Sequence, residues 1–136
     1  MTALLRKLLA CALVAGASPT YAASFECLEN NRADCDMRAS GAIHCTDERD
    51  NPTLRYIKSR LVITEATLVT CLSECLPPLP VTTVEDGANK RTNVFGAKTG
   101  IGALTVVIDH ATGEFIETII ALGSHTTTKI GRCVRK

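Results

Sequence analysis

The sequence predicts a mainly β protein, a small antiparallel β-meander folded as a sandwich or a partly open barrel. One observation is composition: once the N-terminal leader described below is removed, 32 of the remaining 113 residues are Val, Ile or Thr. Their branched β-carbons disfavour helices and pack well in strands. The other observation is that the second half of the chain consists of short apolar runs separated by turn residues. A chain of this length is sufficient for one domain.

The C-terminal half contains the clearest strands. Residues 103–109 place Leu104, Val106 and Ile108 on one face, and residues 114–122 form a second strand after the loop 110–113. Gly113 suits the left-handed position that closes a four-residue hairpin loop. The second strand is apolar on both faces, which predicts burial on both sides; the faces are Phe115, Ile119 and Ala121, and Ile116, Ile120 and Leu122. After a turn at 123–125, residues 126–134 alternate as a last strand that carries Cys133.

The middle of the chain is less regular. Residues 53–64 alternate as a half-exposed strand, and 81–85 and 92–95 are shorter candidate strands. Segment 65–76 fits two interpretations, a strand, which its Thr and Val content favours, or one short helix that Pro77 ends. Residues 25–52 have few apolar side chains and three cysteines. We therefore expect an irregular N-terminal segment tied down by disulfides.

The first 23 residues resemble a secretory signal peptide. Residues 1–7 carry two positive charges, residues 8–17 are uninterruptedly apolar, and small residues follow up to Ala22 and Ala23, where cleavage is expected. Ten apolar residues are about half of the ~20 that a membrane-spanning helix needs. Lipidation at Cys11 is disfavoured, since cleavage there leaves too short an apolar region. Residues 24–136 are then a single exported domain, periplasmic or extracellular. The chain has no N-x-[ST] acceptor, which favours a bacterial over a eukaryotic origin.

Removal of the leader changes the cysteine count from seven to six and leaves 13 basic and 14 acidic side chains. An even number of cysteines in an exported domain predicts three disulfides, whose 15 connectivities the sequence cannot separate. Segment 25–50 is acidic and segment 125–136 is basic, which favours a bridge between the two ends of the domain. The favoured pairs are Cys27 with Cys133, Cys35 with Cys45, and Cys71 with Cys75.

The sequence contains no motif for a cofactor, a metal or nucleic acid. The glycine-rich stretch 96–102 lacks the glycine that a phosphate-binding loop places directly before its lysine. His44, His110 and His125 do not have metal-ligand spacing. In an oxidising compartment the cysteines form disulfides, so their thiolates are not available as zinc ligands. The nearly balanced charge and the absence of tryptophan disfavour a nucleic-acid partner.

A rigid scaffold without catalytic motifs predicts a non-enzymatic binding protein. We expect a macromolecular partner, with the protein acting as a hydrolase inhibitor or as a factor directed at a host or envelope component. The basic residues Lys90, Arg91 and Lys98 are the candidate partner-binding surface. Two alternatives remain open: a structural envelope component, and a small secreted hydrolase that uses a cluster of acids and a histidine, namely Asp109, His110 and Glu114.

Overall fold

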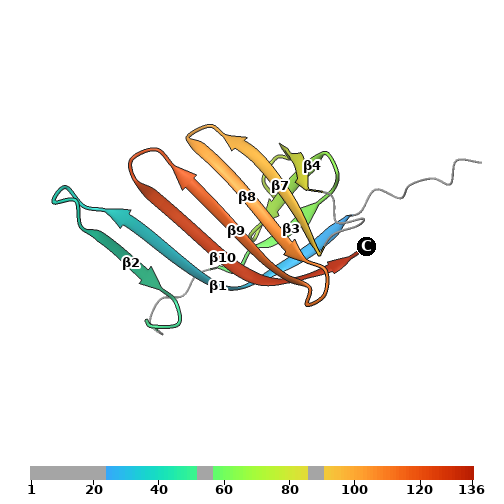
Figure 1. Cartoon of the computed structure of the whole chain (residues 1–136), viewed down its shortest axis with the longest axis horizontal. Helices are drawn as coiled ribbons and strands as arrows, with labels where there is room; N and C mark the ends of the chain where they lie inside the picture. Colours follow the sequence, from blue (N-terminus) through green and yellow to red (C-terminus); the bar gives the residue numbers. More distant parts are fainter. Residues whose placement is uncertain (1–23, 52–56, 86–90) are drawn as a thin grey trace, which may run out of the picture.

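The protein is mainly β, as predicted, and its strands form one antiparallel sheet (Figure 1). The computed structural model describes residues 24–51, 57–85 and 91–136, and within these ranges the chain contains no helix. The ten strands are β1 (Phe25–Met37), β2 (Ile43–Asp47), β3 (Arg60–Ile63), β4 (Thr67–Cys71), β5 (Leu79–Pro80), β6 (Thr82–Glu85), β7 (Thr92–Thr99), β8 (Gly102–Asp109), β9 (Glu114–Ala121) and β10 (His125–Arg135).

The sheet curls into a nearly closed barrel. Its strand order is β5-β4-β3-β1-β10-β9-β8-β7-β6, and β5 lies beside β7 at the place where the barrel closes. Strand β1 is central, because it pairs with β10 along one edge and with β3 and then β2 along the other. Its second half, together with β2 and the start of β10, extends away from the closed part of the barrel (Figure 1).

The core lies inside the closed part of the barrel. It is formed by inward side chains of seven strands, namely Phe25, Cys27, Leu61, Ile63, Leu68, Phe95, Leu104, Val106, Ile108, Phe115 and Cys133. The predicted inward face of residues 103–109 is confirmed, since Leu104, Val106 and Ile108 are all buried. The hairpin that follows is also confirmed: Gly113 has a φ of 70°, which glycine adopts without the steric cost that other residues meet.

Three disulfides join the cysteines in the pairs that the sequence favoured. Cys27–Cys133 lies between directly opposed residues of β1 and β10, and Cys35–Cys45 does the same for β1 and β2. Cys71–Cys75 closes the short loop after β4. Three bridges are consistent with an exported protein. In the described ranges, no helix has the length and apolar character that crossing a membrane requires.

The prediction that residues 25–52 are irregular is wrong. The thirteen residues of β1 form an uninterrupted strand apart from a bulge between Glu29 and Asn31, and β2 is paired with it over five residues. The sequence suggested irregularity because the segment has few apolar side chains. A central strand is stabilised by hydrogen bonds along both edges, and in this segment the inward polar side chains find polar partners of their own.

The middle of the chain contains a strand where a helix was the alternative. Residues 67–71 form β4, so the short helix within 65–76 does not occur. Helical spacing of its leucines and cysteines is outweighed by pairing with β3 and β5. The strand expected over 53–64 is shorter than predicted, since β3 begins at Arg60, and part of the expected strand (52–56) lies outside the described residues. Strand β7 is longer than the predicted 92–95.

The expectation that β9 is buried on both sides is also wrong. Phe115 is 1% exposed, whereas its neighbour Ile116 is 49% exposed, and Ile120 and Leu122 are exposed as well. The barrel closes on itself, so it encloses only one face of each strand. No second layer among the described residues covers the outer face.

Gly131 allows two strands to approach closely. It lies opposite Phe115 on β9, and a Cβ atom placed on it would lie 2.6 Å from the Phe115 ring and 2.0 Å from the Leu28 carbonyl oxygen. Only glycine fits this position without a shift of the backbone.

Candidate functional site

The outward side of β7 to β10 carries a row of aliphatic side chains. The registers place Ile130 opposite Ile116, Ile116 opposite Val107, and Val107 opposite Val94. Four strands at the usual spacing make this row about 14 Å wide between outer Cα atoms. The next row outward along the strands contains no charge and is made of Gly96, Thr105, Thr118 and Thr128. We call these eight residues the outer apolar face.

A shallow groove of about 480 Å³ lies over one side of the outer apolar face. Its lining includes Val107, Ile116 and Ile130, and charged residues lie at one end. There, Arg132 of β10 is opposite Glu114 of β9. The groove therefore offers an apolar floor with both signs of charge at its rim. An apolar centre surrounded by a polar rim is also found in interfaces between proteins.

The inward side of the same strands carries a buried ion pair. The Lys129 Nζ atom lies 2.9 Å from Glu117 Oε2, and the two side chains are 7% and 0% exposed. No hydrogen-bond donor among the described residues is aligned with either oxygen of Glu117, so the lysine charge is its partner. Strands β9 and β10 thus direct charged side chains inward and isoleucines outward.

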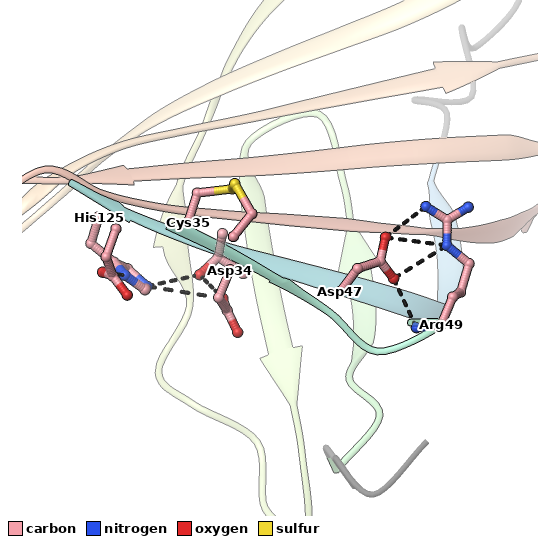
Figure 2. The surroundings of a disulfide bond; sticks show 8 residues. Asp34, Cys35, Asp47, Arg49 and His125 are labelled. Atoms are coloured by element: carbon pink, nitrogen blue, oxygen red, sulfur yellow. Dashed lines mark hydrogen bonds and ion pairs between the residues drawn. A yellow bond between two sulfur atoms is a disulfide. The ribbon is translucent and has the colours of Figure 1, made fainter. Parts of the chain in front are cut away.

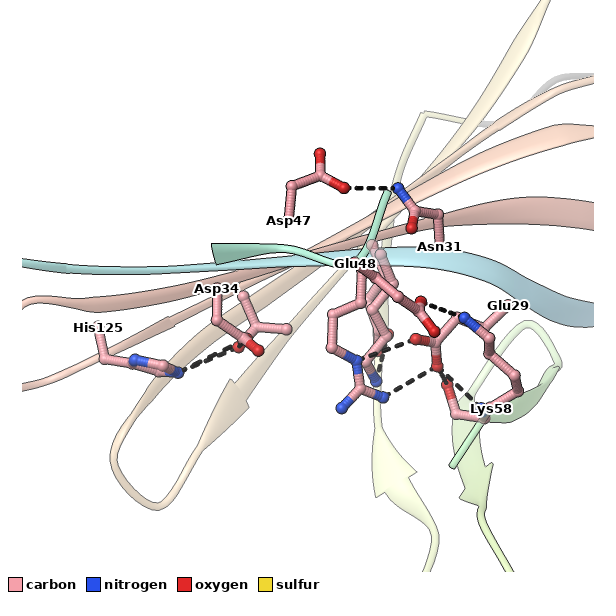
Figure 3. A network of polar contacts seen from close by, with 12 residues as sticks. Glu29, Asn31, Asp34, Asp47, Glu48, Lys58 and His125 are labelled. Atoms are coloured by element: carbon pink, nitrogen blue, oxygen red, sulfur yellow. Dashed lines mark hydrogen bonds and ion pairs between the residues drawn. The ribbon is translucent and has the colours of Figure 1, made fainter. Parts of the chain in front are cut away.

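A second buried carboxylate is held beside the bulge of β1 (Figure 3). Glu29 accepts hydrogen bonds of 2.9 Å from Arg32 Nε and Nη2, and of 2.8 Å and 2.6 Å from the Ser59 backbone and hydroxyl. Burial alone would raise the pKa of Glu29, but the hydrogen bonds from Arg32 and Ser59 outweigh burial and hold it below its ordinary value. This network fixes the segment before β3 to β1.

The extended half of the sheet carries an acid–histidine–hydroxyl network (Figures 2 and 3). His125 Nδ1 lies 2.5 Å from Asp36 Oδ1, and His125 Nε2 lies 3.1 Å from Thr127 Oγ1. The Thr127 hydroxyl donates to Asp34 Oδ1 at 2.5 Å. The four residues form two opposed pairs across β1 and β10.

This network resembles a nucleophile with its base and acid, but its hydrogen bonds have the opposite polarity. Thr127 has one hydroxyl hydrogen, and the shorter contact directs that hydrogen to Asp34. His125 Nε2 must then donate to Thr127 while Nδ1 donates to Asp36, which requires the protonated imidazolium. The hydrogen bond to Asp36 accordingly raises the pKa of His125, against a smaller opposing effect of burial. The arrangement stabilises a cation and does not activate the hydroxyl.

The residues of the alternative hydrolase site have other partners. Asp109 accepts hydrogen bonds from Arg91 at 2.8 Å and from the backbone of Ala111 and Thr112, which shapes the β8–β9 turn. The hydrogen bond from Arg91 holds the pKa of Asp109 below its ordinary value. His110 instead lies edge-on to the Phe25 ring. Glu114 is adjacent to Thr112, whose hydroxyl lies 3.2 Å from its carboxylate.

The structure describes two of the three basic residues that the sequence proposed as a partner-binding surface. Lys90 lies outside the described residues, Arg91 is engaged with Asp109, and Lys98 lies near the far end of β7. Seven residues of an extended strand separate Arg91 from Lys98 by about 23 Å. In the described part of the chain, no three His, Cys, Asp or Glu residues are arranged to hold a metal ion.

The alternation in the sequence contains a signal for the outer apolar face, although it predicts burial on both sides of β9. Ile116 precedes Glu117, and Ile130 follows Lys129, so strict alternation puts a charge and an isoleucine on opposite faces. Alternation alone does not tell which of the two faces lies inside the barrel, because that depends on the register with the neighbouring strands. No protein-family model, curated protein or solved structure is significantly similar to this chain.

Proposed function

We propose that this protein is a small exported binding protein whose macromolecular partner is another protein. The observation that supports this is the outer apolar face, where isoleucines remain exposed while Glu117 and Lys129 occupy the interior of the same strands. The largest contiguous exposed apolar patch of a monomeric protein is often an interaction site.

The chemistry of the face favours a protein over other macromolecules. A glycan or single-stranded nucleic acid would be recognised by aromatic stacking, and the eight residues of the face contain no aromatic side chain. A duplex would require clustered cations, and the groove rim pairs Arg132 with Glu114. An apolar surface with a mixed-charge rim best fits a protein of similar character.

The three disulfides and the leader-like N-terminus support a role outside the cytoplasm. We place the protein in the periplasm or the extracellular space of a bacterium, acting on a hydrolase or on an envelope or host component. The Cys27–Cys133 bridge would hold β10, one strand of the outer apolar face, to β1, and a preorganised surface lowers the entropic cost of binding.

Substitution of the outer face tests this function. Ile116→Glu places a charge at the centre of the row and should leave the fold intact, since Ile116 is 49% exposed. Leu72→Glu is the matched control, at 45% exposure in the loop after β4. We expect a saturable protein complex from envelope or host extract that Ile116→Glu weakens at least tenfold and Leu72→Glu preserves.

The proposal is wrong if no saturable complex forms, or if Ile116→Glu binds as tightly as the wild-type chain. A complex made only of two copies of this chain would also contradict it, because the partner is expected to be a different protein.

A further inference from the structure

Three turns meet at one end of the sheet. The Leu122 backbone amide donates to the Ile101 carbonyl at 2.8 Å, which joins the β9–β10 and β7–β8 turns. The Met37 amide donates to the Ser124 carbonyl at 3.1 Å, which joins the end of β1 to the β9–β10 turn. In Figure 1 these turns follow one another along the left and upper side, with the β1–β2 turn extending farthest.

These turns carry large aliphatic side chains that point into solvent. Leu122 is 84% exposed and Ile101 is 63% exposed, and at the β1–β2 hairpin Ile43 and its opposed neighbour Met37 are 73% and 51% exposed. Turns usually carry small or polar residues. We call these four residues the aliphatic edge.

The opposite end of the sheet has the usual polar character. The β8–β9 turn is His110, Ala111, Thr112 and Gly113, and its flanking residues Asp109 and Glu114 are charged. This turn and the C-terminus lie on the right-hand side of Figure 1. The four residues of the aliphatic edge therefore lie together at one end of the sheet, whereas the exposed Leu72 and Leu76 belong to the separate loop after β4.

The turn segments 37–43, 98–102 and 121–125 carry two basic side chains and no acid. Arg38 follows β1, and Lys98 lies near the end of β7; both are exposed. Asp36 is hydrogen-bonded to His125, and Asp34 accepts the hydrogen bond of Thr127. His44 lies opposite Asp36 on β2. Two cations thus lie beside the apolar side chains, while the nearby acids have partners within the sheet.

We propose that the aliphatic edge docks on the surface of a lipid membrane that carries anionic headgroups. Aliphatic side chains flanked by basic residues are the combination that binds at a membrane interface, where the apolar groups enter the boundary and the cations meet the headgroups. The positive charges match anionic lipid, and a fluid interface can accommodate side chains from three separate turns. Docking in this way leaves most of the outer apolar face open to a protein partner.

This proposal is independent of the proposed function, because it involves different residues. The aliphatic edge lies on turns, and the outer apolar face lies on the strands between them. A substitution on one surface therefore tests that surface alone.

Single tryptophans give a direct test, because the chain contains none. Leu122→Trp places the probe on the aliphatic edge, and Val134→Trp places it at an exposed position toward the other end of β10, with 58% exposure. The probe lipid is a vesicle of phosphatidylglycerol and phosphatidylethanolamine. We expect the emission of the Leu122→Trp protein to shift to shorter wavelength on addition of vesicles, and that of the Val134→Trp protein to stay unchanged. No shift for Leu122→Trp, or equal shifts for both, would overturn the proposal.

Vesicle cosedimentation of tryptophan-free variants removes any effect of the probe. The double substitution Ile101→Ser with Leu122→Ser should weaken binding at least tenfold, whereas Val134→Ser and Ile116→Glu should stay within about twofold of the wild-type chain. Phosphatidylcholine vesicles should bind several-fold more weakly at low salt. Unchanged binding of the double variant, or equal binding to both kinds of vesicle, would contradict docking of this edge on anionic lipid.

Discussion

The inner and outer faces of β9 and β10 invert the usual distribution of side chains. Inward, Glu117 and Lys129 form an ion pair that is almost fully buried. Outward, the adjacent residues Ile116 and Ile130 are 49% and 36% exposed. The two pairs are directly opposed across the same two strands, so neither strand propensity nor hydropathy of the segment explains the difference.

Whether a residue of these strands contributes to stability therefore depends on whether its side chain is enclosed by the barrel, and not on its hydropathy. Inside the barrel a charged side chain is retained because its partner lies within reach, and outside it an isoleucine contributes little because water still reaches it. Substitutions inward should therefore change the free energy of unfolding, and substitutions outward should change binding.

The largest effect is expected at the apolar part of the interior. Phe115→Ala should lower the free energy of unfolding by about 4 kcal/mol, because a fully buried ring is replaced by a cavity. Ile116→Ala, the matched outward substitution, should change it by less than about 0.5 kcal/mol. Urea denaturation measures both values. Equal costs for the two substitutions would remove the distinction between the faces.

Removal of only one partner of the buried ion pair should lower the free energy of unfolding by nearly as much. Lys129→Met leaves the Glu117 carboxylate buried without its cation and should lower the free energy of unfolding by about 3 kcal/mol. The double variant Lys129→Met with Glu117→Leu should recover most of that loss, since apolar residues can replace a buried pair. If the double variant is as unstable as the single one, the pair is not what holds the two side chains inside.

Substitution of Gly131 should have a smaller effect on the free energy of unfolding, and this effect arises from the close approach of β1 and Phe115 to β10. Gly131→Ala should lower the free energy of unfolding by about 2 kcal/mol, because its methyl group overlaps the Phe115 ring and the Leu28 carbonyl. Gly100→Ala is the control, since a Cβ atom there meets no neighbour within 4 Å. A Gly131→Ala protein as stable as the wild-type chain would show that β1 and β10 are not in close contact at this position.

The smallest effect is expected in the extended half of the sheet and depends on pH. The hydrogen bond to Asp36 raises the pKa of His125 in the folded state, so its stabilising contribution is complete below the unfolded value of about 6.5 and is lost as pH rises through the raised pKa. The urea midpoint of the wild-type protein should exceed that of His125→Gln by a small margin at pH 6, and the margin should disappear at higher pH. A margin that is constant with pH would exclude this origin.

Much of the fold could be predicted from local patterns. Alternation identified the strands that become β8, β9 and β10, and Gly113 identified the turn between the first two of them. Burial could not be predicted in the same way. The exposed faces of β9 depend on how the sheet closes, and β1 is a strand because of partners that are distant in sequence.

The candidate surfaces were missed for the same reason. Arg91 and Lys98 are close in the sequence but lie at opposite ends of the extended β7 segment, whereas Ile116 and Ile130 are 14 residues apart and lie opposite one another. The residues of the aliphatic edge come from three turns, which the pairing of β1, β10, β9 and β8 and the hydrogen bonds between the turns bring together.

The most direct measurement is site-specific photocrosslinking from the outer apolar face in a bacterium that exports the chain. A photoreactive amino acid at position 116 should give a discrete product with one other protein, and the same amino acid at position 72 should give none. This product should also disappear when Ile130→Glu is added. Identical products from both positions, or no product from position 116, would contradict the claim that the outer apolar face is the surface through which this protein acts.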